Sequence, residues 1–188
     1  MRDTSADFGR LGTDCHLACC ELGEIKMIQG IKQPEIIQID NTLRLRKYDG
    51  VHDFTLEWYL DEETVYLVDG KKDPYTMERL KGMYEYLKDE GELYFIEVLE
   101  EGTYKPIGDV TFWHGDMPIV IGDRNYRGKQ IGRKVVSALV ERGKELGYDH
   151  LEIGEIYDWN EGSRRCFESV GFVAYEKTEK GAKYRLAL

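Results

Sequence analysis

Residues 125–136, NYRGKQIGRKVV, place two glycines around a basic turn that runs directly into an amphipathic helix. Gly128 and Gly132 carry no Cβ, so the backbone there can approach a ligand closely. N–H groups at the start of a helix have no partner within the helix, and the helix dipole is positive there. The turn therefore suits a pyrophosphate or another anion, although glycines also serve simply to cap helices.

The segments around this turn predict a mixed β-sheet with helices on both faces, an α+β fold. Apolar residues recur at three- and four-residue spacing in the expected helices and alternate in the expected strands. We expect helices at 51–60, 73–91, 131–148 and 160–170, with Pro74 in the first turn of the second. We expect strands at 42–48, 92–100, 104–116, 117–123 and 150–159, a hairpin over 172–188, and a short strand or loop at 63–70. The apolar strand at 117–123 should be buried on both faces.

The 188-residue chain is long enough for one domain with a sizeable core. We expect that domain to span residues 41–188, behind an N-terminal extension over 1–40. No apolar run approaches the roughly 18 residues of a membrane helix, and the first residues lack the order of a signal peptide, so we expect a cytoplasmic protein with no membrane partner. The formal net charge of −10 argues against nucleic acid and favours a cationic partner.

Three of the four cysteines lie in the extension, beside His16. Cys15, His16 and Cys19 have a spacing that a metal site could use, but no second ligand pair follows at the distance of a zinc finger. We therefore expect no metal and favour free thiols on an N-terminal helix in a reducing cytosol. Cys166 has no histidine beside it in the sequence, which argues against an acyl-carrying nucleophile.

The turn and the segments after it resemble the GNAT family of acetyl-CoA-dependent N-acetyltransferases. The family's pyrophosphate loop reads Arg/Gln-x-x-Gly-x-Gly/Ala, and residues 127–132 read RGKQIG, with Gln130 where the family usually has glycine. The family continues with a strand, an asparagine and a short helix that ends in Gly-Phe. Here these are residues 151–159, Asn160, residues 161–170 and Gly171-Phe172. A Rossmann or Walker A loop is excluded, because G-x-G-x-x-G and Gly-Lys-Ser/Thr are both absent.

The resemblance implies acetyl-CoA as the cofactor, held in a gap between two splayed central strands. Backbone N–H groups of the loop would hold the pyrophosphate, the pantetheine arm would lie in the gap, and an N–H near Ile121 would polarise the thioester carbonyl. The residues that would bind the cofactor are Ile121, Gly122, Arg127, Gly128, Lys129, Gln130, Ile131, Gly132, Arg133, Asn160 and Phe167.

The resemblance also implies two proton-transfer roles. A protonated amine must lose a proton, and we favour Glu155 as the base because some family members carry an acid five residues before the asparagine. A surface carboxylate paired with a lysine is the alternative for Glu155; Asp116, Asp123 and His114 are weaker candidates for the base. The family's usual acid is a tyrosine at the position of Phe167, so Tyr157, Tyr126 or solvent would protonate the CoA thiolate.

The acceptor site is expected in the early helices. Trp58, Tyr59 and Asp61, followed by two glutamates, form an aromatic and acidic cluster that suits a cation, and Asp116 could contribute from the other side. The same residues could equally be core aromatics and a solvated turn. A short resemblance to aminoglycoside 6′-N-acetyltransferases lies in this segment.

The sequence therefore predicts direct transfer of an acetyl group from acetyl-CoA to a primary amine of a small cationic molecule or peptide. The enzyme could be a homodimer. Two alternatives remain open: a CoA-binding regulatory module that is catalytically weak, and a structural domain whose glycines only cap a helix.

Overall fold

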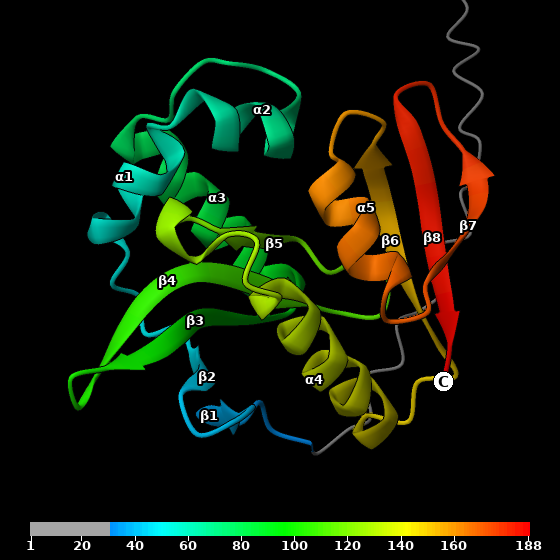
Figure 1. Ribbon diagram of the computed structural model, residues 1–188, viewed down its shortest axis with the longest axis horizontal. Coiled ribbons are helices and arrows are strands. Elements are labelled where there is room, and N and C mark those ends of the chain that lie inside the picture. The colour runs from blue at the N-terminus through cyan, green and yellow to red at the C-terminus, as the bar shows by residue number, and fades with distance from the viewer. Residues whose placement is uncertain (1–30) are drawn as a thin grey trace, which may run out of the picture.

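The computed structural model describes residues 31–188 (Figure 1), so the interpretations of Cys15, His16 and Cys19 lie outside the described residues. Strands β3 (Glu92–Glu100) and β4 (Thr103–Phe112) form the expected hairpin. They belong to an antiparallel sheet of order β1-β2-β3-β4-β5, completed by β1 (Ile36–Gln38), β2 (Leu43–Lys47) and β5 (Ile119–Ile121). This sheet begins before residue 41, within the segment assigned to the extension, so the boundary itself stays a prediction.

A second antiparallel sheet has the order β6-β8-β7, formed by β6 (His150–Tyr157), β7 (Val173–Lys177) and β8 (Gly181–Ala187). Strands β5 and β6 belong to different sheets and diverge (Figure 1). At their closed end Glu152 N donates to His114 O at 3.0 Å, and Gly154 N donates to the Asp116 carboxylate at 3.2 Å. The expected splay of two central strands is therefore present, and the fold is α+β.

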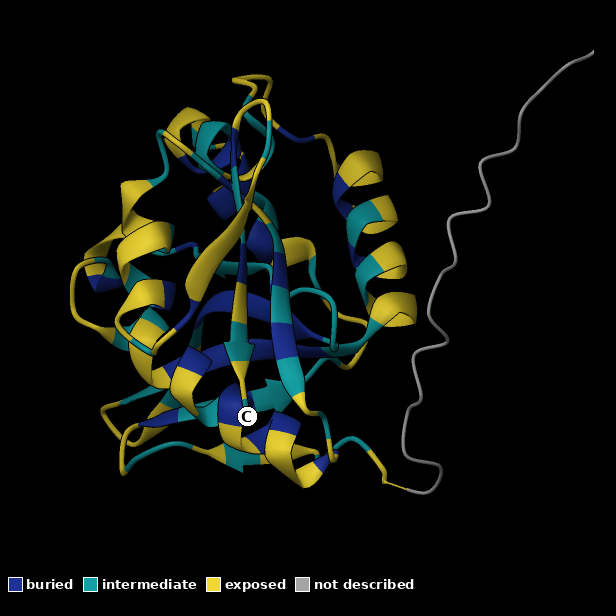
Figure 2. Ribbon diagram, turned by 90° about the vertical axis from the view of Figure 1, so that its right-hand side faces the viewer, coloured by how far each residue is buried: buried dark blue, intermediate teal, exposed yellow. Residues whose placement is uncertain are grey.

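Helices cover both faces of the five-stranded sheet. On one side lie η1 (Asp53–Thr55), α1 (Leu56–Tyr59), α2 (Glu62–Asp69) and α3 (Met77–Glu90). On the other lies α4 (Ile131–Glu145), preceded by η2 (Arg124–Tyr126), whereas α5 (Glu161–Glu168) packs on α4 and on β6 of the second sheet. Successive residues of β3 alternate between the two cores: Leu93 and Phe95 pack under α1 and α3, and Tyr94 and Ile96 pack under α4. Figure 2 shows buried strands between helices whose outer faces are exposed. None of the described helices is long and apolar enough to cross a membrane.

Three sequence expectations are wrong in detail. Residues 63–70, expected as a strand or loop, belong to α2, because Asp61 caps the helix start and Gly70, at φ +68°, ends it. Pro74 precedes α3 rather than lying in its first turn, since Thr76 is the N-cap and accepts from Arg79 N at 3.2 Å. Strand β5 is only half-buried rather than buried on both faces, because it lines a cavity.

A buried carboxylate ties two helices to the sheet. Asp109 in β4 is 3% exposed and accepts hydrogen bonds from Tyr59 OH of α1 at 3.0 Å and from Tyr84 OH of α3 at 2.7 Å. Burial raises the pKa of Asp109 to about 6, and the two hydroxyls only partly offset this effect. Between the unfolded pKa of about 3.8 and the folded value, the folded state binds more protons, so this group makes the fold less stable as pH rises.

Replacing Asp109 with asparagine should remove this dependence. The free energy of unfolding of Asp109→Asn, relative to the parent protein, should rise by about 2–3 kcal/mol between pH 4 and pH 7, since one pKa unit corresponds to about 1.4 kcal/mol. Urea unfolding of both proteins at each pH measures this difference. Parallel stability curves over that range would contradict the assigned titration.

Candidate functional site

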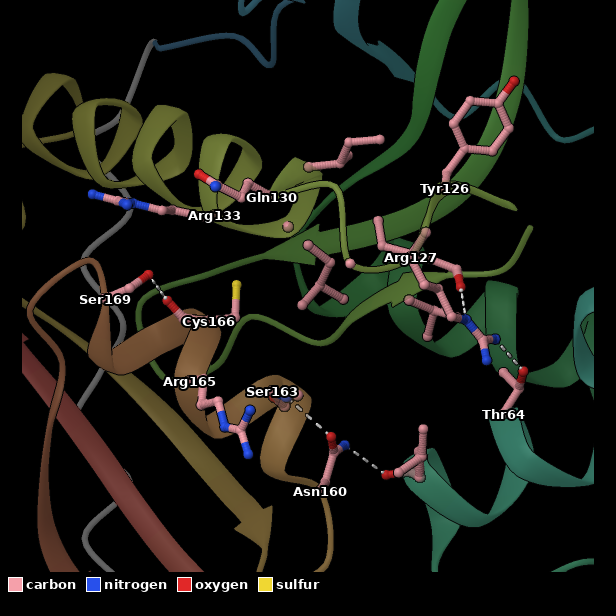
Figure 3. Close-up of a pocket in the computed structure, with 18 of the residues that line it drawn as sticks. Thr64, Tyr126, Arg127, Gln130, Arg133, Asn160, Ser163, Arg165, Cys166 and Ser169 are labelled. Carbon is pink, nitrogen blue, oxygen red and sulfur yellow. Dashed lines mark hydrogen bonds between the residues drawn. The ribbon is translucent and has the colours of Figure 1, made fainter. Parts of the chain in front are cut away.

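A cavity of about 570 Å³ opens between β5, the start of α4 and α5 (Figure 3). Its walls come from four segments: α2, β5, the turn that leads into α4, and the start and inner face of α5. Eight of the residues expected to bind a cofactor line it, namely Ile121, Arg127, Gly128, Gln130, Ile131, Gly132, Arg133 and Asn160. The fold therefore gathers residues that are 39 positions apart in the chain around one space.

The start of α4 is open toward this cavity. Among the described helices of at least eight residues, α2, α3 and α5 have a side-chain cap, whereas the N-cap Gln130 of α4 makes no side-chain cap hydrogen bond. The first hydrogen bond within α4 runs from Lys134 N to Gln130 O at 3.2 Å. The preceding N–H groups of the first turn are therefore free to bind an anion, and the positive end of the helix dipole favours one.

The backbone of the turn adopts left-handed conformations at two places. Gly128 has φ +72° and Gln130 has φ +61°. Glycine adopts this region without cost, whereas Gln130 occupies it as a strained non-glycine residue. Gln130 stands where the family motif has glycine, and it keeps the backbone conformation that glycine favours. Its N–H remains part of the turn.

The basic side chains of the turn are not all directed at the anion site. Arg127 donates to Ile121 O at 2.9 Å and to Thr64 Oγ1 of α2 at 2.6 Å (Figure 3). Lys129 does not line the cavity, and its ammonium lies 5.2 Å from the ring centre of Tyr126. Arg127 therefore joins the turn to α2.

The far wall of the cavity is α5. Asn160 caps this helix by accepting from Ser163 N at 3.0 Å, and its amide donates to Leu67 O of α2 at 3.1 Å (Figure 3). Cys166 also lines the cavity, and a Cβ on Gly132 would lie 3.2 Å from its Sγ. Burial raises the pKa of the Cys166 thiol to about 11, so the thiol is neutral and a weak nucleophile at pH 7.

Two further residues expected to contact a cofactor lie outside the cavity walls. A Cβ on Gly122 would lie 2.2 Å from the Trp58 ring, so this glycine makes room for the tryptophan. Phe167 is 1% exposed and packs in the core against Phe172, with ring centres 5.3 Å apart. The expectation that Phe167 packs against the cofactor is not supported by this geometry, because its helix turns the ring inward.

Phe167→Tyr should accordingly affect stability rather than ligand binding. The new hydroxyl would be buried among apolar groups without a partner, which costs about 1–3 kcal/mol of unfolding free energy. CoA affinity of the folded variant should stay unchanged. Phe54→Tyr is the matched control, because Phe54 is 39% exposed and its added hydroxyl can reach water. Increased turnover in Phe167→Tyr would argue instead for a place beside the reacting sulfur.

Both candidate proton-transfer residues lie on β6 but outside the cavity walls. Glu155 is exposed and accepts a hydrogen bond from Thr178 in the β7–β8 turn. The alternative for Glu155 was a surface carboxylate paired with a lysine. Among the described residues no lysine pairs with it, and its partner is the Thr178 hydroxyl instead. Tyr157 is half-buried and stacks on Trp159, with ring centres 4.6 Å apart. Their roles stay predictions.

The expected acceptor residues have structural partners. Tyr59 is buried against Asp109, and Trp58 is 9% exposed against Gly122, so neither offers a face to a substrate. Asp61 caps α2 and pairs with Arg124 at 2.9 Å; although partial burial opposes the change, hydrogen bonds from Arg124 and Thr64 lower the pKa of Asp61.

Asp116 lies at the closed end of the splay. Its carboxylate accepts from Gly154 N at 3.2 Å and from Met117 N at 2.8 Å. Burial raises the pKa of Asp116 against the effect of these two N–H donors. A Cβ on Gly154 would lie 3.0 Å from this carboxylate, so the glycine provides its space. The carboxylate thus spaces β5 from β6, and a role in substrate binding stays a prediction.

Sequence reasoning missed the contribution of α2. Thr64, Leu67 and Val68 line the cavity, yet their segment was expected to be a strand or loop. The available signal was Asp61, an N-cap residue type directly before two glutamates, which favours a helix start.

Comparison with known proteins agrees with this geometry. The model of the Acetyltransferase (GNAT) family matches residues 52–172, well over half of the chain. No curated protein sequence matches significantly. Among solved structures, a domain from Methanocaldococcus jannaschii shares 23% identity with a TM-score of 0.69, over 79% of this chain and 100% of that one.

Two further structures contain ligands. AAC(6′)-Ib, in complex with paromomycin and acetyl-CoA, has a TM-score of 0.63 and 18% identity over 78% of this chain and 94% of that one. RimL, a ribosomal L7/L12 alpha-N-protein acetyltransferase in complex with coenzyme A, has a TM-score of 0.63 and 16% identity over 82% and 98%. At these identities the likeness concerns the fold. The family match over residues 52–172 shows that the chain belongs to the GNAT family of acetyltransferases.

Proposed function

We propose that this acetyltransferase moves the acetyl group of acetyl-CoA directly onto a primary amine of a small cationic molecule or peptide. The observation that carries the proposal is the uncapped start of α4 at the mouth of the cavity between β5 and α5. The free N–H groups suit the pyrophosphate, and the cavity is large enough for the arm that follows it. The structures of AAC(6′)-Ib and RimL with acetyl-CoA or CoA support this donor.

Strand β5 would hold the pantetheine arm. It is the last strand of its sheet, so the edge that faces the splay has no neighbouring strand. Unpaired N–H and C=O groups on such an edge can pair with the amides of a bound ligand. An N–H near Ile121 would then polarise the thioester carbonyl as negative charge develops on its oxygen.

Direct attack by the amine is favoured over an acyl-enzyme intermediate. Cys166 is the cysteine in the cavity walls, and its raised pKa leaves it protonated at pH 7. The amine nitrogen forms a bond to the thioester carbonyl carbon, the carbon–sulfur bond breaks, and CoA leaves as a thiolate. Glu155 takes the proton of the amine, directly or through a water, and Tyr157 or solvent protonates the thiolate.

The net charge of −10 supports a cationic acceptor, because it attracts cations over a long range. The carboxylates at the start of α2 contribute less than the sequence suggests, since Asp61 and Glu63 are paired with Arg124. Exposed Glu155 on β6 therefore becomes the main acidic group proposed on the acceptor side. A cytoplasmic location and a possible homodimer complete the proposal.

An acceptor screen that follows release of free CoA thiol tests the proposal. Polyamines, aminoglycosides and peptides with free N-termini or lysines are offered with acetyl-CoA, and mass spectrometry locates the added acetyl group. We expect amine-dependent thiol release with at least one class. CoA binding without turnover across the panel would favour a regulatory module, and no CoA binding would favour a structural domain.

A further inference from the structure

Three side chains that the proposed reaction does not use meet at the closed end of the splay. His114 lies in the turn between β4 and β5, and Asp149 and His150 lie at the start of β6. One nitrogen of each histidine and one carboxylate oxygen lie within 4.8 Å of one another. We propose that this cluster binds a divalent transition-metal ion of the Zn²⁺ type.

The backbone brings the two histidines together before any ion arrives. Glu152 N donates to His114 O at 3.0 Å, which fixes the turn against β6. The two imidazole rings are 4.4 Å apart between centres and inclined by 78°, and the ring of Tyr148 packs on His114 at 5.2 Å. The entropy of joining two distant segments is therefore already lost when the protein folds, which favours binding.

The chemistry of the donors suits Zn²⁺. Two imidazoles and one carboxylate are a common protein ligand set, and water takes the fourth tetrahedral position. Ligand bonds of roughly 2.0–2.2 Å place donor atoms about 3.4 Å apart. Donors separated by up to 4.8 Å therefore have to approach one another, whereas His150 Nδ1 and Asp149, which are hydrogen-bonded, have to move apart to admit the ion. Asp149 is 88% exposed and His150 is 28% exposed, so both can rotate.

His150 also has a carboxylate at each ring nitrogen. Its Nδ1 is hydrogen-bonded to Asp149, and its Nε2 lies 3.6 Å from Glu152. An ion between Nδ1 and Asp149 replaces their hydrogen bond. Glu152 then faces the opposite nitrogen, and such an outer carboxylate orients a ligating imidazole. Arg185 donates to Glu152 at 3.0 Å and holds that carboxylate in place.

None of the three proposed ligands lines the cavity. An ion at this position joins the turn before β5 to the first residues of β6, so it would clamp the closed end of the splay. Its effect should therefore appear as stabilisation of the fold by ligand linkage. This makes metal binding separable from acetyl transfer.

Titration of the full chain with Co²⁺, followed by competition with Zn²⁺, tests the proposal. Co²⁺ reports its ligands by visible absorption, and we expect one ion per chain with nitrogen and oxygen ligands and a rise in melting temperature. His114→Ala and His150→Gln should each weaken binding at least tenfold while remaining folded without metal. His52→Ala is the matched control, because His52 lies elsewhere and is hydrogen-bonded to Tyr48.

Thiols are also metal ligands, so a second variant tests whether the three cysteines near the N-terminus bind the added Co²⁺. The variant Cys15→Ser, Cys19→Ser, Cys20→Ser should keep the Co²⁺ site, and no thiolate charge-transfer band should accompany it. Binding that disappears in this variant but survives in His114→Ala and His150→Gln would overturn the proposal. Failure of the full chain to bind Co²⁺ or Zn²⁺ at up to tenfold molar excess would overturn it equally.

Discussion

Glu155→Gln should lower kcat/KM for acetyl transfer by roughly 10²–10⁴-fold, the usual contribution of a general base. Glutamine keeps the shape of the side chain and can still accept the hydrogen bond from Thr178, but it cannot take a proton from the amine. Acetyl-CoA affinity should hardly change, because Glu155 does not line the cavity. Steady-state kinetics over a pH series, with calorimetry for CoA, measure both quantities.

The pH profile distinguishes proton transfer from charge neutralisation. Loss of the base should remove the acidic limb of the kcat/KM profile. A raised KM with near-normal kcat and an unaltered limb would mean instead that Glu155 only balances the charge of the acceptor. Glu176→Gln is the matched control: it removes one carboxylate from β7, at the far edge of the same sheet, where Glu176 pairs with Lys183 at 2.9 Å.

Gly132→Glu should weaken CoA binding at least tenfold, about 1.4 kcal/mol, in a protein that still folds. Gly132 lies in the first turn of α4, and a Cβ there already approaches Cys166 Sγ to 3.2 Å. A glutamate adds both volume at the cavity wall and a negative charge at the helix start where the pyrophosphate is expected. Isothermal calorimetry with CoA gives the affinity, and thermal unfolding checks the fold.

Two variants separate these contributions. Gly132→Ala adds only the Cβ, and Ser137→Glu adds the same charge at an exposed position further along α4. We expect a small effect from each. Unchanged CoA affinity in folded Gly132→Glu would remove the pyrophosphate from this turn and return its glycines to a capping role.

The turn and its helix could be predicted from sequence because their signals are local. Two glycines, a basic run and the apolar spacing after Ile131 all lie within one segment, and the structure builds the cavity mouth from it. The hairpin of β3 and β4 was equally legible, because two runs rich in β-branched and aromatic residues flank a short turn that contains glycine.

Other parts of the site depend on contacts between distant segments. Residues 63–70 include Thr64, Val65 and Val68, β-branched residues that favour a strand, and the cap at Asp61 together with packing decides for a helix. Residue 122 has to be a glycine because the Trp58 ring, 64 positions earlier in the chain, fills the space of a Cβ. The Tyr59 hydroxyl is hydrogen-bonded to Asp109 and so is not available to a substrate. No local pattern distinguishes such residues from ligand contacts.

Helix α2 is hydrogen-bonded to two different parts of the cavity wall. Arg127 of the turn donates to Thr64, and Asn160 at the start of α5 donates to Leu67. An anion that recruits the Arg127 guanidinium has to break its bond to Thr64, so part of the anion's binding free energy is spent on loosening that helix. If the anion at the turn changes the affinity of α2 for a second molecule by some factor, that molecule must change the affinity of the turn for the anion by the same factor. The anion at the turn and a molecule bound against α2 would thereby influence each other's affinity through this eight-residue helix, in addition to any direct contact between them.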